Sequence, residues 1–477
     1  MGQLLRLPRR ARTNDVVVSL PGYKGVSDVI GKRVSSTCLL LAAAMAVVGC
    51  GKLTDTYKCR SNDPDTRIAG CTELIQNEWL TPEQLSVAYH NRATAYSAKR
   101  NYNRAIQDFN QAIHLSPKYA AAYNGRGIAH YDLGLAHGGS KDYDLAIQDY
   151  NEAIRLSPAY SSAHYNRGVA WNTRGMAQDK TENYDQAIGS YNQAIQAFTQ
   201  TIRLNPNFAS AWYGRGRAYD SRGDEGATAD DYEHAIQDYN QAIRLSPREE
   251  VIYQSRAIAH NELANYDQAI QDLNEAIRLS PKDAIDYAFR GASWEHKGDE
   301  DRAIRDFDES IRLNPKDSYI YEARGEVWLL RSNLPAAAAD FEKALSGASS
   351  PRMAVDAALM VHVAMERQGR DDARKLARVA AAADLSQWPG PLMKFAMRKM
   401  TAGALRGSAS DPRNARRIWH VCSANYFIGE EALFHNQRST ALARLQAARD
   451  GCPQWDVDYL AALAEIKRLE APRAPAN

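Results

Sequence analysis

The sequence predicts an all-α fold, a solenoid of antiparallel helix pairs stacked one on the next. The first observation behind this prediction is a phrase that recurs from residue 88 to residue 349, with clear copies at residues 265–281 (NYDQAIQDLNEAIRLSP) and 300–315 (EDRAIRDFDESIRLNP). The second observation is its period, because the closing prolines Pro247, Pro281 and Pro315 follow one another at intervals of 34 residues. A period of this size is typical of a helix–turn–helix unit that buries its apolar face only against its neighbours.

The positions inside one copy explain each element of the predicted unit. In the copy that ends at Pro315, Tyr287 stands fourth, Gly291 eighth, Ala303 twentieth and Phe307 twenty-fourth. Small residues are needed where the two helices of a unit touch, and a ring at the twenty-fourth place fills the gap to the next unit. The closing proline cannot continue the second helix (helix B) and turns the chain into the next copy.

These positions resemble the tetratricopeptide repeat (TPR) pattern. About seven consecutive units show it, within residues 84–349. Their closing residues are Pro117, Pro158, Pro206, Pro247, Pro281, Pro315 and, more loosely, Ser349. The resemblance implies a right-handed superhelical solenoid, whose concave groove is lined mainly by the first helix of each pair (helix A) and binds other proteins.

Three copies are longer than the standard unit, since their closing prolines follow at intervals of 41, 48 and 41 residues. The excess is one, two and one blocks of seven residues, and seven residues are about two helical turns. An insertion of that length extends a helix without rotating its apolar stripe, so we expect helix A to be extended at residues 135–141, 176–182 and 225–231. A longer loop between the helices is the alternative, because these segments contain Gly and Asp. The second block of the third copy lies inside helix B, at residues 191–198.

Charged residues occupy two fixed places of the repeat. The seventh place is Arg in every unit, at Arg92, Arg126, Arg167, Arg215, Arg256, Arg290 and Arg324. The twenty-third place is Asp at Asp108, Asp149, Asp238, Asp272, Asp306 and Asp340. The helices of a unit are antiparallel and close, so we expect an Arg–Asp ladder along the array, with a row of anion-binding arginines as the alternative. The third unit has Ser190 where Asp is expected, so Arg167 is predicted to lack an acidic partner.

The first fifty residues predict export and a lipid anchor. A basic pair precedes an apolar run of eleven residues (38–48), which is too short to cross a bilayer but has the length of a signal-peptide core. The run ends in VVGC, which resembles a bacterial lipobox, and the resemblance implies that residues 29–49 are removed and that Cys50 carries a diacylglycerol group. Gly51 favours the outer membrane over the inner one. Residues 1–28 are then a misassigned start or a disordered extension.

Four further cysteines form two local pairs, and export makes disulfides the expected state. The end of the chain fits the repeat template with Gly429 at the eighth place, which puts Cys422 at the start of one helix and Cys452 at the end of its antiparallel partner. We therefore predict a Cys422–Cys452 disulfide that brackets a helical hairpin, and a Cys59–Cys71 disulfide that closes the incoming half-unit in the same way. A different pairing, free thiols and a metal site are the alternatives, although the close CxxC pairs of zinc sites are missing.

The C-terminal region (residues 350–470) is predicted to be helical, with weaker repeat signals. It begins with a helix pair at residues 353–383, which the turn QWPGP (387–391) ends. A basic helix (393–405) and a loop (406–412) follow.

The order of features from residue 388 to residue 469 is similar to that of NlpI-type envelope lipoproteins. Both have a Trp-containing turn, a short helix pair, a hairpin like NYFIGEEALF and a closing helix like VDYLAALAEIKRL. Those proteins are TPR adaptors that bring proteases and peptidoglycan hydrolases together, so the resemblance implies an adaptor. Residues 50–83 are then a tether with a half-unit, and residues 471–477 are a disordered tail.

The sequence gives little sign of chemistry. It contains no Gly-rich phosphate loop, HExxH or GxSxG motif, and His130 and His260 fall at the eleventh place, which belongs to the core. A net charge of +2 over 477 residues leaves no basic stripe for nucleic acid. We therefore expect no enzyme, no metal, no cofactor and no nucleic-acid partner. The alternative is a hydrolase with a C-terminal site, for which the candidates are His362, Glu366, Asp371, His420 and Glu430.

The predicted groove is rich in aromatic and amide side chains, which suit an extended or helical peptide. Its predicted residues are Asn124, Tyr131, Tyr165, Asn166, Asn172, Tyr213, Arg217, Asp220, Gln254, Asn261, Phe289, Glu295 and Glu322. His90 and Thr94 stand where chaperone-type TPR domains have the Lys and Asn of a carboxylate clamp, so free C-terminal carboxylates are not the expected ligand. The alternative is that these side chains only solvate the groove.

Together these features predict a lipid-anchored periplasmic TPR scaffold, or adaptor, which recruits an envelope protease or a peptidoglycan hydrolase. A structural or assembly factor that acts by self-association, as a homo-oligomer, is the alternative in the same compartment.

Overall fold

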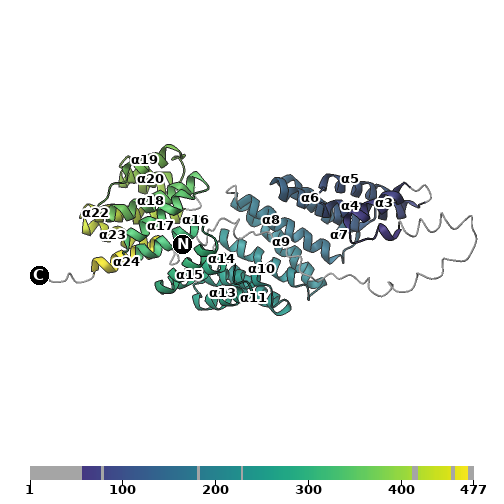
Figure 1. Cartoon of the computed structure of the whole chain (residues 1–477), viewed down its shortest axis with the longest axis horizontal. Helices are drawn as coiled ribbons and strands as arrows, with labels where there is room; N and C mark the ends of the chain where they lie inside the picture. Colours follow the sequence, from purple (N-terminus) through teal and green to yellow (C-terminus); the bar gives the residue numbers. More distant parts are fainter. Residues whose placement is uncertain are drawn as a thin grey trace, which may run out of the picture. The chain divides into compact units, whose positions relative to one another are not determined.

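The computed structural model describes residues 56–76, 80–179, 183–226, 229–410, 417–452 and 457–470. These residues are helical with short connections and contain no strand, which confirms the predicted all-α fold. They divide at Pro247 into two compact units, the N-terminal unit (residues 56–247) and the C-terminal unit (residues 248–470). Figure 1 shows the helices of each unit packed in antiparallel pairs.

The N-terminal unit is built from four helix pairs that follow a single leading helix. Its helices are α3 (Pro64–Ile75), α4 (Pro82–Ala98), α5 (Tyr102–Leu115), α6 (Ala120–His137), α7 (Ser140–Leu156), α8 (Ser161–Asp179), α9 (Tyr184–Leu204), α10 (Ala209–Gly226) and α11 (Ala229–Leu245). Helices α4 and α5, α6 and α7, α8 and α9, and α10 and α11 form the pairs, and the second helix of one pair packs against the first helix of the next.

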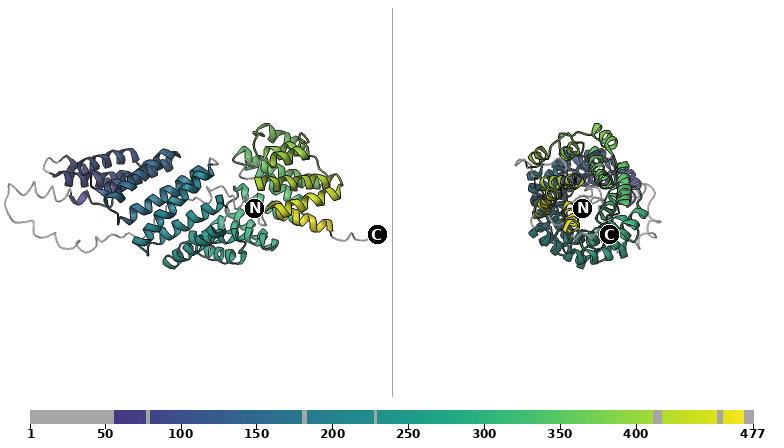
Figure 2. Two further views of the ribbon diagram at one scale, coloured as in Figure 1. Left: turned by 180° about the vertical axis from the view of Figure 1, so that it is seen from behind. Right: turned by 90° about the vertical axis from the view of Figure 1, so that its left-hand side faces the viewer.

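The C-terminal unit continues with three pairs and then changes to a cap. The paired helices are α12 (Glu250–Glu262), α13 (Tyr266–Leu279), α14 (Ala284–His296), α15 (Glu300–Leu313), α16 (Ser318–Leu330) and α17 (Leu334–Ser346). The cap contains α18 (Pro351–Arg367), α19 (Ala373–Ala381), α20 (Gly390–Ala396), α21 (Ala402–Ala409), α22 (Arg417–Phe434), α23 (Arg438–Gly451) and α24 (Val457–Glu470). Figure 2 shows these pairs from behind, with the cap helices in green and yellow.

In five of the seven repeats the two helices meet where a glycine at the eighth place faces a ring, and Ala93 and Ala257 stand at this place in the other two. A Cβ atom on Gly291 would lie 2.9 Å from Phe307, and one on Gly325 would lie 2.7 Å from Phe341. These distances are shorter than van der Waals contact, so only glycine allows the two helices to approach this closely. The predicted roles of the eighth and twenty-fourth places are confirmed, and Gly429 shows the same contact against Leu445 in the hairpin of α22 and α23.

The seven-residue blocks are helical, but they are not confined to helix A. Standard helices α12 and α13 have 13 and 14 residues, whereas α6 and α7 have 18 and 17. Each block therefore adds to both helices of a pair, and it also adds a glycine–ring contact, as between Gly134 and Tyr143 or Gly223 and Tyr232. The prediction that helix A is extended is confirmed, since α6, α8 and α10 have 18, 19 and 18 residues. Helix B is extended as well, which was not predicted, because an extended helix needs an equally long partner to cover its apolar stripe. Helix α9, with 21 residues, contains the predicted second block.

Both predicted disulfides are present. Cys59 and Cys71 are joined with their Cα atoms 4.5 Å apart, and Cys422 and Cys452 with theirs 5.2 Å apart. All four residues are buried. The second bond joins the first turns of α22 to the end of α23, as the repeat register predicted.

The cap differs from the sequence prediction around residue 400. The predicted basic helix at residues 393–405 is two short helices, α20 and α21, separated by residues 397–401. Arg398 in this break has a φ of +58°, a conformation that a continuous right-handed helix does not contain. The predicted loop at residues 406–412 is helical as far as Ala409.

Buried ion pairs connect α24 to α18 and α22 within the cap. The Arg367 guanidinium donates to both carboxylate oxygens of Glu430 at 2.8 and 2.7 Å, and its Nη1 lies 2.7 Å from Glu465 Oε1. The three side chains are at most 13% exposed and come from α18, α22 and α24. Helix α24 also packs against α16 of the last helix pair.

Several predictions concern parts of the chain outside the described residues. These are the signal segment at residues 29–49, Cys50, the extension at residues 1–28 and the tail at residues 471–477. Among the described helices, none combines the length and the apolar character that a membrane crossing requires. The division at Pro247 was not predicted, and it falls at the end of the last lengthened repeat.

Candidate functional site

The predicted Arg–Asp ladder is formed in six of the repeats. Arg92, Arg126, Arg215, Arg256, Arg290 and Arg324 pair with Asp108, Asp149, Asp238, Asp272, Asp306 and Asp340. In the pair of Arg290 and Asp306, for example, Nε and Nη2 each donate to one carboxylate oxygen, at 2.8 and 2.7 Å. These six guanidinium groups are therefore engaged within the fold, which favours the ladder over an anion-binding row.

The same arginines also contact the preceding unit. Arg290 Nη1 donates to Asn274 at 2.8 Å, and Arg324 Nη1 donates to Asp308, in each case sixteen residues back along the chain. Arg290 in addition lies over the ring of Tyr287. An arginine with such a contact connects its own helix pair to the element before it and helps to hold the stack in register.

The residue opposite Arg167 is not the one that the sequence suggested. Gly168 faces Phe198, so Phe198 occupies the place of the ring in this repeat. The residue before it, Ala197, therefore stands where the other repeats have the ladder aspartate, and it is fully buried. Ser190, predicted to occupy that place, donates instead to Gln178 Oε1 at 2.7 Å. The second block of seven residues in α9 shifts the register by two turns and accounts for the difference. Arg167 donates to Asn151, and burial lowers its pKa.

The predicted groove residues of the N-terminal unit contact one another across neighbouring A helices. Asn166 Nδ2 donates to Asn124 Oδ1 at 3.0 Å, and the Tyr131 hydroxyl lies 3.0 Å from Thr173 Oγ1. Tyr165 packs against the rings of Phe198 and Phe208, Tyr213 packs against Tyr239, and Arg217 lies over Tyr213. Asn172 is 7% exposed. These side chains contribute to the packing between repeats, and their role in a groove stays a prediction.

The amide groups of the C-terminal unit have the same structural role. Gln254 Nε2 donates to Asp286 Oδ1 at 2.8 Å, and Ser293 Oγ contacts Asn261 Oδ1 at 3.0 Å. Phe289, predicted to line the groove, is 1% exposed and belongs to the hydrophobic core. Its ring packs inward against apolar residues of the neighbouring helices, so the prediction that Phe289 lines the groove is wrong.

An acidic stretch follows these amides along the A helices of the C-terminal unit. It consists of Glu295 on α14, Glu322 and Glu326 on α16, and Asp356 on α18, and we call these four residues the acidic stretch. Glu295, Glu322 and Glu326 are 3%, 5% and 3% exposed. Both carboxylate oxygens of Glu295 and Oε1 of Glu322 are buried without a hydrogen-bond partner.

These carboxylates destabilise one another's charge. Burial and the nearby charge of Glu326 raise the pKa of Glu295 to about 8. Burial, Glu326 and Asp356 raise the pKa of Glu322 well above its ordinary value. A buried carboxylate is stabilised by a neighbouring cation, so the stretch favours a positively charged ligand. Glu295 and Glu322 were predicted to line the groove. Glu326 and Asp356 were missed, although Glu326 stands at the ninth place of its repeat and Asp356 at the fifth place of the segment that follows.

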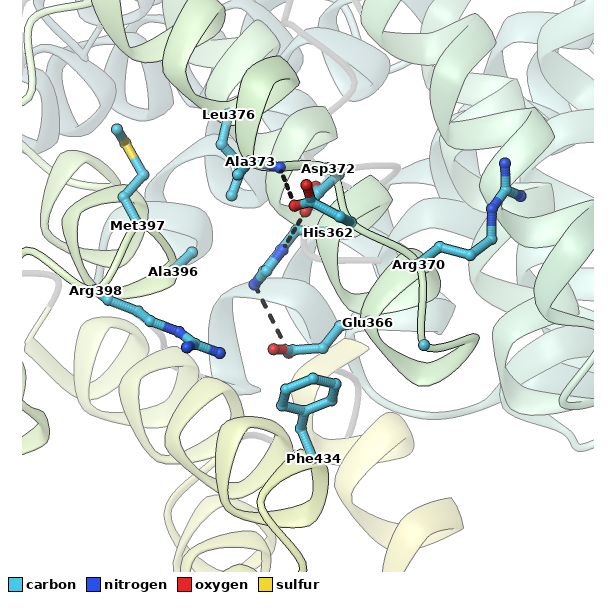
Figure 3. Close-up of a pocket in the computed structure, with 12 residues that line it drawn as sticks. His362, Glu366, Arg370, Asp372, Ala373, Leu376, Ala396, Met397, Arg398 and Phe434 are labelled. Atoms are coloured by element: carbon cyan, nitrogen blue, oxygen red, sulfur yellow. Dashed lines mark hydrogen bonds and ion pairs between the residues drawn. The ribbon is translucent and has the colours of Figure 1, made fainter.

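The five hydrolase candidates do not form one site. His362, Glu366 and Asp371 line a pocket of about 430 Å³ in the cap, shown in Figure 3. His420 stacks on the Trp388 ring with 4.2 Å between ring centroids, and Glu430 is held by Arg367. The twelve residues that line the pocket include no Ser, Cys, Thr or Lys, so a nucleophile on this wall would have to be a histidine or a carboxylate.

The titrating groups of this pocket influence each other. Burial raises the pKa of Glu366 to about 7, and the Glu431 carboxylate adds to the shift while His362 opposes it. Burial lowers the pKa of His362, but the hydrogen bond and the charge of Asp372 outweigh burial and raise it overall. The geometry therefore couples a histidine to several carboxylates.

A stack of antiparallel helix pairs, each closed by a small-residue contact with a ring, defines a helical repeat solenoid. Tetratricopeptide repeat models match residues 125–200, residues 88–134, residues 172–250 with 295–353, and residues 251–283. Together these matches cover more than half of the 477 residues, and the chain belongs to the tetratricopeptide repeat family. It is a repeat scaffold of the type that binds other proteins. The similarity of its C-terminal region to NlpI-type lipoproteins stays a prediction.

Solved structures of TPR proteins are similar in part. MamA has 22% sequence identity and a TM-score of 0.32, with 39% of this chain and 95% of that chain covered. A TPR protein from Parabacteroides merdae has 18% identity and a TM-score of 0.39, over 58% of this chain and 96% of the other. The C-terminal part of a TPR protein from Cytophaga hutchinsonii has 17% identity and a TM-score of 0.42, over 57% and 98%. No curated protein matches the sequence.

Proposed function

We propose that the chain is a periplasmic scaffold, anchored by a lipid on Cys50, that binds a Lys- or Arg-rich segment of an envelope protease or peptidoglycan hydrolase. The observation that carries the binding part of this proposal is the acidic stretch on the A helices of the C-terminal unit. The lipobox at Cys50 and the signal-like segment before it support the anchor.

The two disulfides support the compartment. Disulfides form and persist in oxidising environments such as the bacterial periplasm and are rare in the cytosol. The two bonds lie on either side of the repeats in the sequence. Cys59–Cys71 lies at α3, before the first repeat, and Cys422–Cys452 lies in the hairpin of α22 and α23, after the last one. A secreted location explains why the cap and the half-unit are covalently closed while the repeats between them contain no cysteine.

The acidic stretch fits a cationic side chain better than a neutral one. Glu295 and Glu322 have buried oxygens that accept no hydrogen bond, and their raised pKa values mean that the charged form is unfavourable without a cationic partner. A lysine ammonium or an arginine guanidinium would supply the missing donors and the opposite charge. Gln254 Nε2 and Asn261 Oδ1, by contrast, already form hydrogen bonds within the fold, although Asn261 Nδ2 is buried without a partner.

The test is capture of partners from a membrane extract, followed by direct binding of the captured segment. The wild-type chain is compared with the double variant Glu295→Gln plus Glu322→Gln, which keeps side-chain shape and removes charge. The matched control is Glu275→Gln plus Glu309→Gln, which changes two glutamates paired to arginines on helix B.

We expect one envelope hydrolase or protease to be recovered with the wild type and the control, and its Lys- or Arg-rich peptide to bind at least about tenfold more weakly to the double variant. Binding of that peptide should also weaken with added salt. Equal binding to all three chains would contradict the cationic-ligand proposal. Recovery of the chain itself alone would instead favour self-association, and a Cys50→Ala chain that remains in the membrane fraction would contradict the lipid anchor.

A further inference from the structure

A cluster of metal-binding side chains lies in the cap, apart from the acidic stretch. His362 and Glu366 are one helical turn apart on α18, and Glu431 reaches the same place from α22. One possible ligand atom from each residue lies within 4.8 Å of the others. His362 Nε2 is 3.6 Å from Glu366 Oε2, so a single ion between them could bind both atoms after a small movement of the side chains.

The histidine is oriented in the way that metal-binding histidines are. Its Nδ1 lies 2.8 Å from Asp372 Oδ1, which leaves Nε2 directed at Glu366, as Figure 3 shows. A carboxylate that holds the second ring nitrogen fixes the tautomer and increases the basicity of the first nitrogen. Asp372 itself is 9% exposed, and its Oδ2 is buried without a partner. This is a supported imidazole rather than an isolated surface histidine.

We propose that His362, Glu366 and Glu431 bind a divalent first-row transition-metal ion such as Zn²⁺. Two carboxylates and one imidazole neutralise the ion and supply three protein ligands, which leaves a coordination position open. Mg²⁺ and Ca²⁺ prefer all-oxygen sites, so the imidazole discriminates against them. The neighbouring pocket of about 430 Å³, with Leu376, Met397 and Phe434 among its walls, gives that open position room for water or an acidic group of a ligand.

Two basic side chains compete with the ion for Glu431. Arg398 Nε lies 3.9 Å from Glu431 Oε1, with 63% of the Arg398 side chain exposed. His435 Nε2 lies 2.9 Å from the same oxygen, with 42% of its side chain exposed. The long arginine contact and the exposure of both groups allow them to move aside when a divalent ion binds. An ion at this site would connect α18 to α22 and would stabilise the cap.

The experiment measures Zn²⁺ binding to the full chain, purified without an affinity tag and freed of metal with a chelator. Isothermal titration calorimetry and elemental analysis after dialysis give the affinity and the stoichiometry. The variants are His362→Gln and Glu431→Gln, which remove a ligand, and Asp372→Asn, which removes only the support of His362. Arg398→Gln removes the competing cation, and Glu309→Gln on the distant helix B serves as the matched control.

We expect one Zn²⁺ per chain, a melting temperature that rises with Zn²⁺, and no such rise with equal Mg²⁺. Loss of a ligand should weaken binding at least about a hundredfold, and Asp372→Asn should weaken it roughly 10- to 100-fold. Arg398→Gln should tighten binding, which a merely misfolded variant cannot do. The absence of stoichiometric Zn²⁺ binding, or equal affinity in wild type, Glu431→Gln and Arg398→Gln, would overturn the proposal.

Discussion

Arg167 Nη1 donates to Asn151 Oδ1 at 2.9 Å, while the ladder residue that would complete its pairing is the buried Ala197. Each of the other six ladder arginines has an aspartate in its own repeat, and a contact to the element before it is present at Arg92, Arg126, Arg215, Arg290 and Arg324. Among the interactions described, Arg167 has only the contact to the preceding repeat and no aspartate in its own. The third unit therefore contains a guanidinium whose burial lowers its pKa and whose charge lacks the aspartate found in its neighbours.

Restoring the missing aspartate should stabilise the chain. Ala197→Asp places a carboxylate opposite Arg167 in the geometry that Arg126 and Asp149 already show. We expect the free energy of unfolding to rise by about 1 kcal/mol, because the arginine is already buried and pre-positioned. Urea unfolding of the wild type and the variant measures the difference.

The control for this change is the same substitution without the arginine. In an Arg167→Met chain, Ala197→Asp buries an unpaired carboxylate and should lower the stability by several kcal/mol, on the order of 3. A double-mutant cycle isolates the pairing energy from the effects of each single change. If Ala197→Asp were equally destabilising in both backgrounds, the assignment of Ala197 to the ladder place would be incorrect.

Glycine at the eighth place should be essential where a ring faces it. Gly325→Ala puts a Cβ atom 2.7 Å from the buried Phe341, and the helices must separate to admit it. We expect a loss of roughly 1 to 3 kcal/mol, measured by urea unfolding. Gly189→Ala is the matched control, since no atom lies within 4 Å of the added Cβ, and it should be neutral or stabilising by up to about 1 kcal/mol. Similar losses in both variants would mean that helix propensity rather than helix contact determines the effect.

These contacts explain which parts of the fold could be predicted from the sequence. The period of 34 residues, the Gly–ring places and the Arg–Asp places are local rules that each copy repeats, so one copy predicts the next. The residue opposite Arg167 could not be identified by counting places in the repeat. The two extra turns of α9 put Phe198, rather than Tyr191, opposite Gly168, so the place before the ring is displaced as well. A shift of this kind depends on how two helices with insertions of different length align, and the sequence of one helix does not determine that alignment.

The candidate sites were less predictable for the same reason. Groove places could be assigned from the repeat, but the sequence does not show that Asn124 and Asn166 bond to each other or that Phe289 points inward. The cap has no strict repeat, so nothing in the spacing of His362 and Glu431 indicates that they meet. Chemistry that is assembled by helices far apart in sequence becomes visible only once the chain is folded.

The disulfide in the cap should contribute substantially to stability. It closes a loop of 30 residues, for which the loss of chain entropy in the unfolded state corresponds to about 3 to 4 kcal/mol. We expect Cys422→Ala plus Cys452→Ala to lower the free energy of unfolding by that amount. Reducing agent also opens Cys59–Cys71 and should lower the stability of the wild type at least as much. Peptide mapping without reduction should recover the two cysteines in one linked fragment. Two free thiols in the mature protein would contradict both the bond and the export proposal.

Acid should weaken the N-terminal unit through His90. The His90 ring packs 5.4 Å from Phe109 and 5.1 Å from Tyr119 between ring centroids, and its Nδ1 is buried without a partner. Burial, helped by the charge of Arg67, lowers the pKa of His90 to about 4. The unfolded chain therefore takes up the proton first, so the stability is complete above pH 6.5 and falls as the pH drops from 6.5 towards 4.

The substitution His90→Phe keeps a ring in this cluster and removes the titrating group. Because the slope for one group is at most about 1.4 kcal/mol per pH unit, the wild type should lose roughly 1 to 2 kcal/mol more than His90→Phe between pH 7 and pH 5. Urea unfolding at both pH values gives the two differences, and His137→Gln, which changes an exposed histidine on α6, should follow the wild type. An identical pH dependence for wild type and His90→Phe would show that His90 is protonated equally easily in the folded and unfolded states, and hence that its ring is open to water.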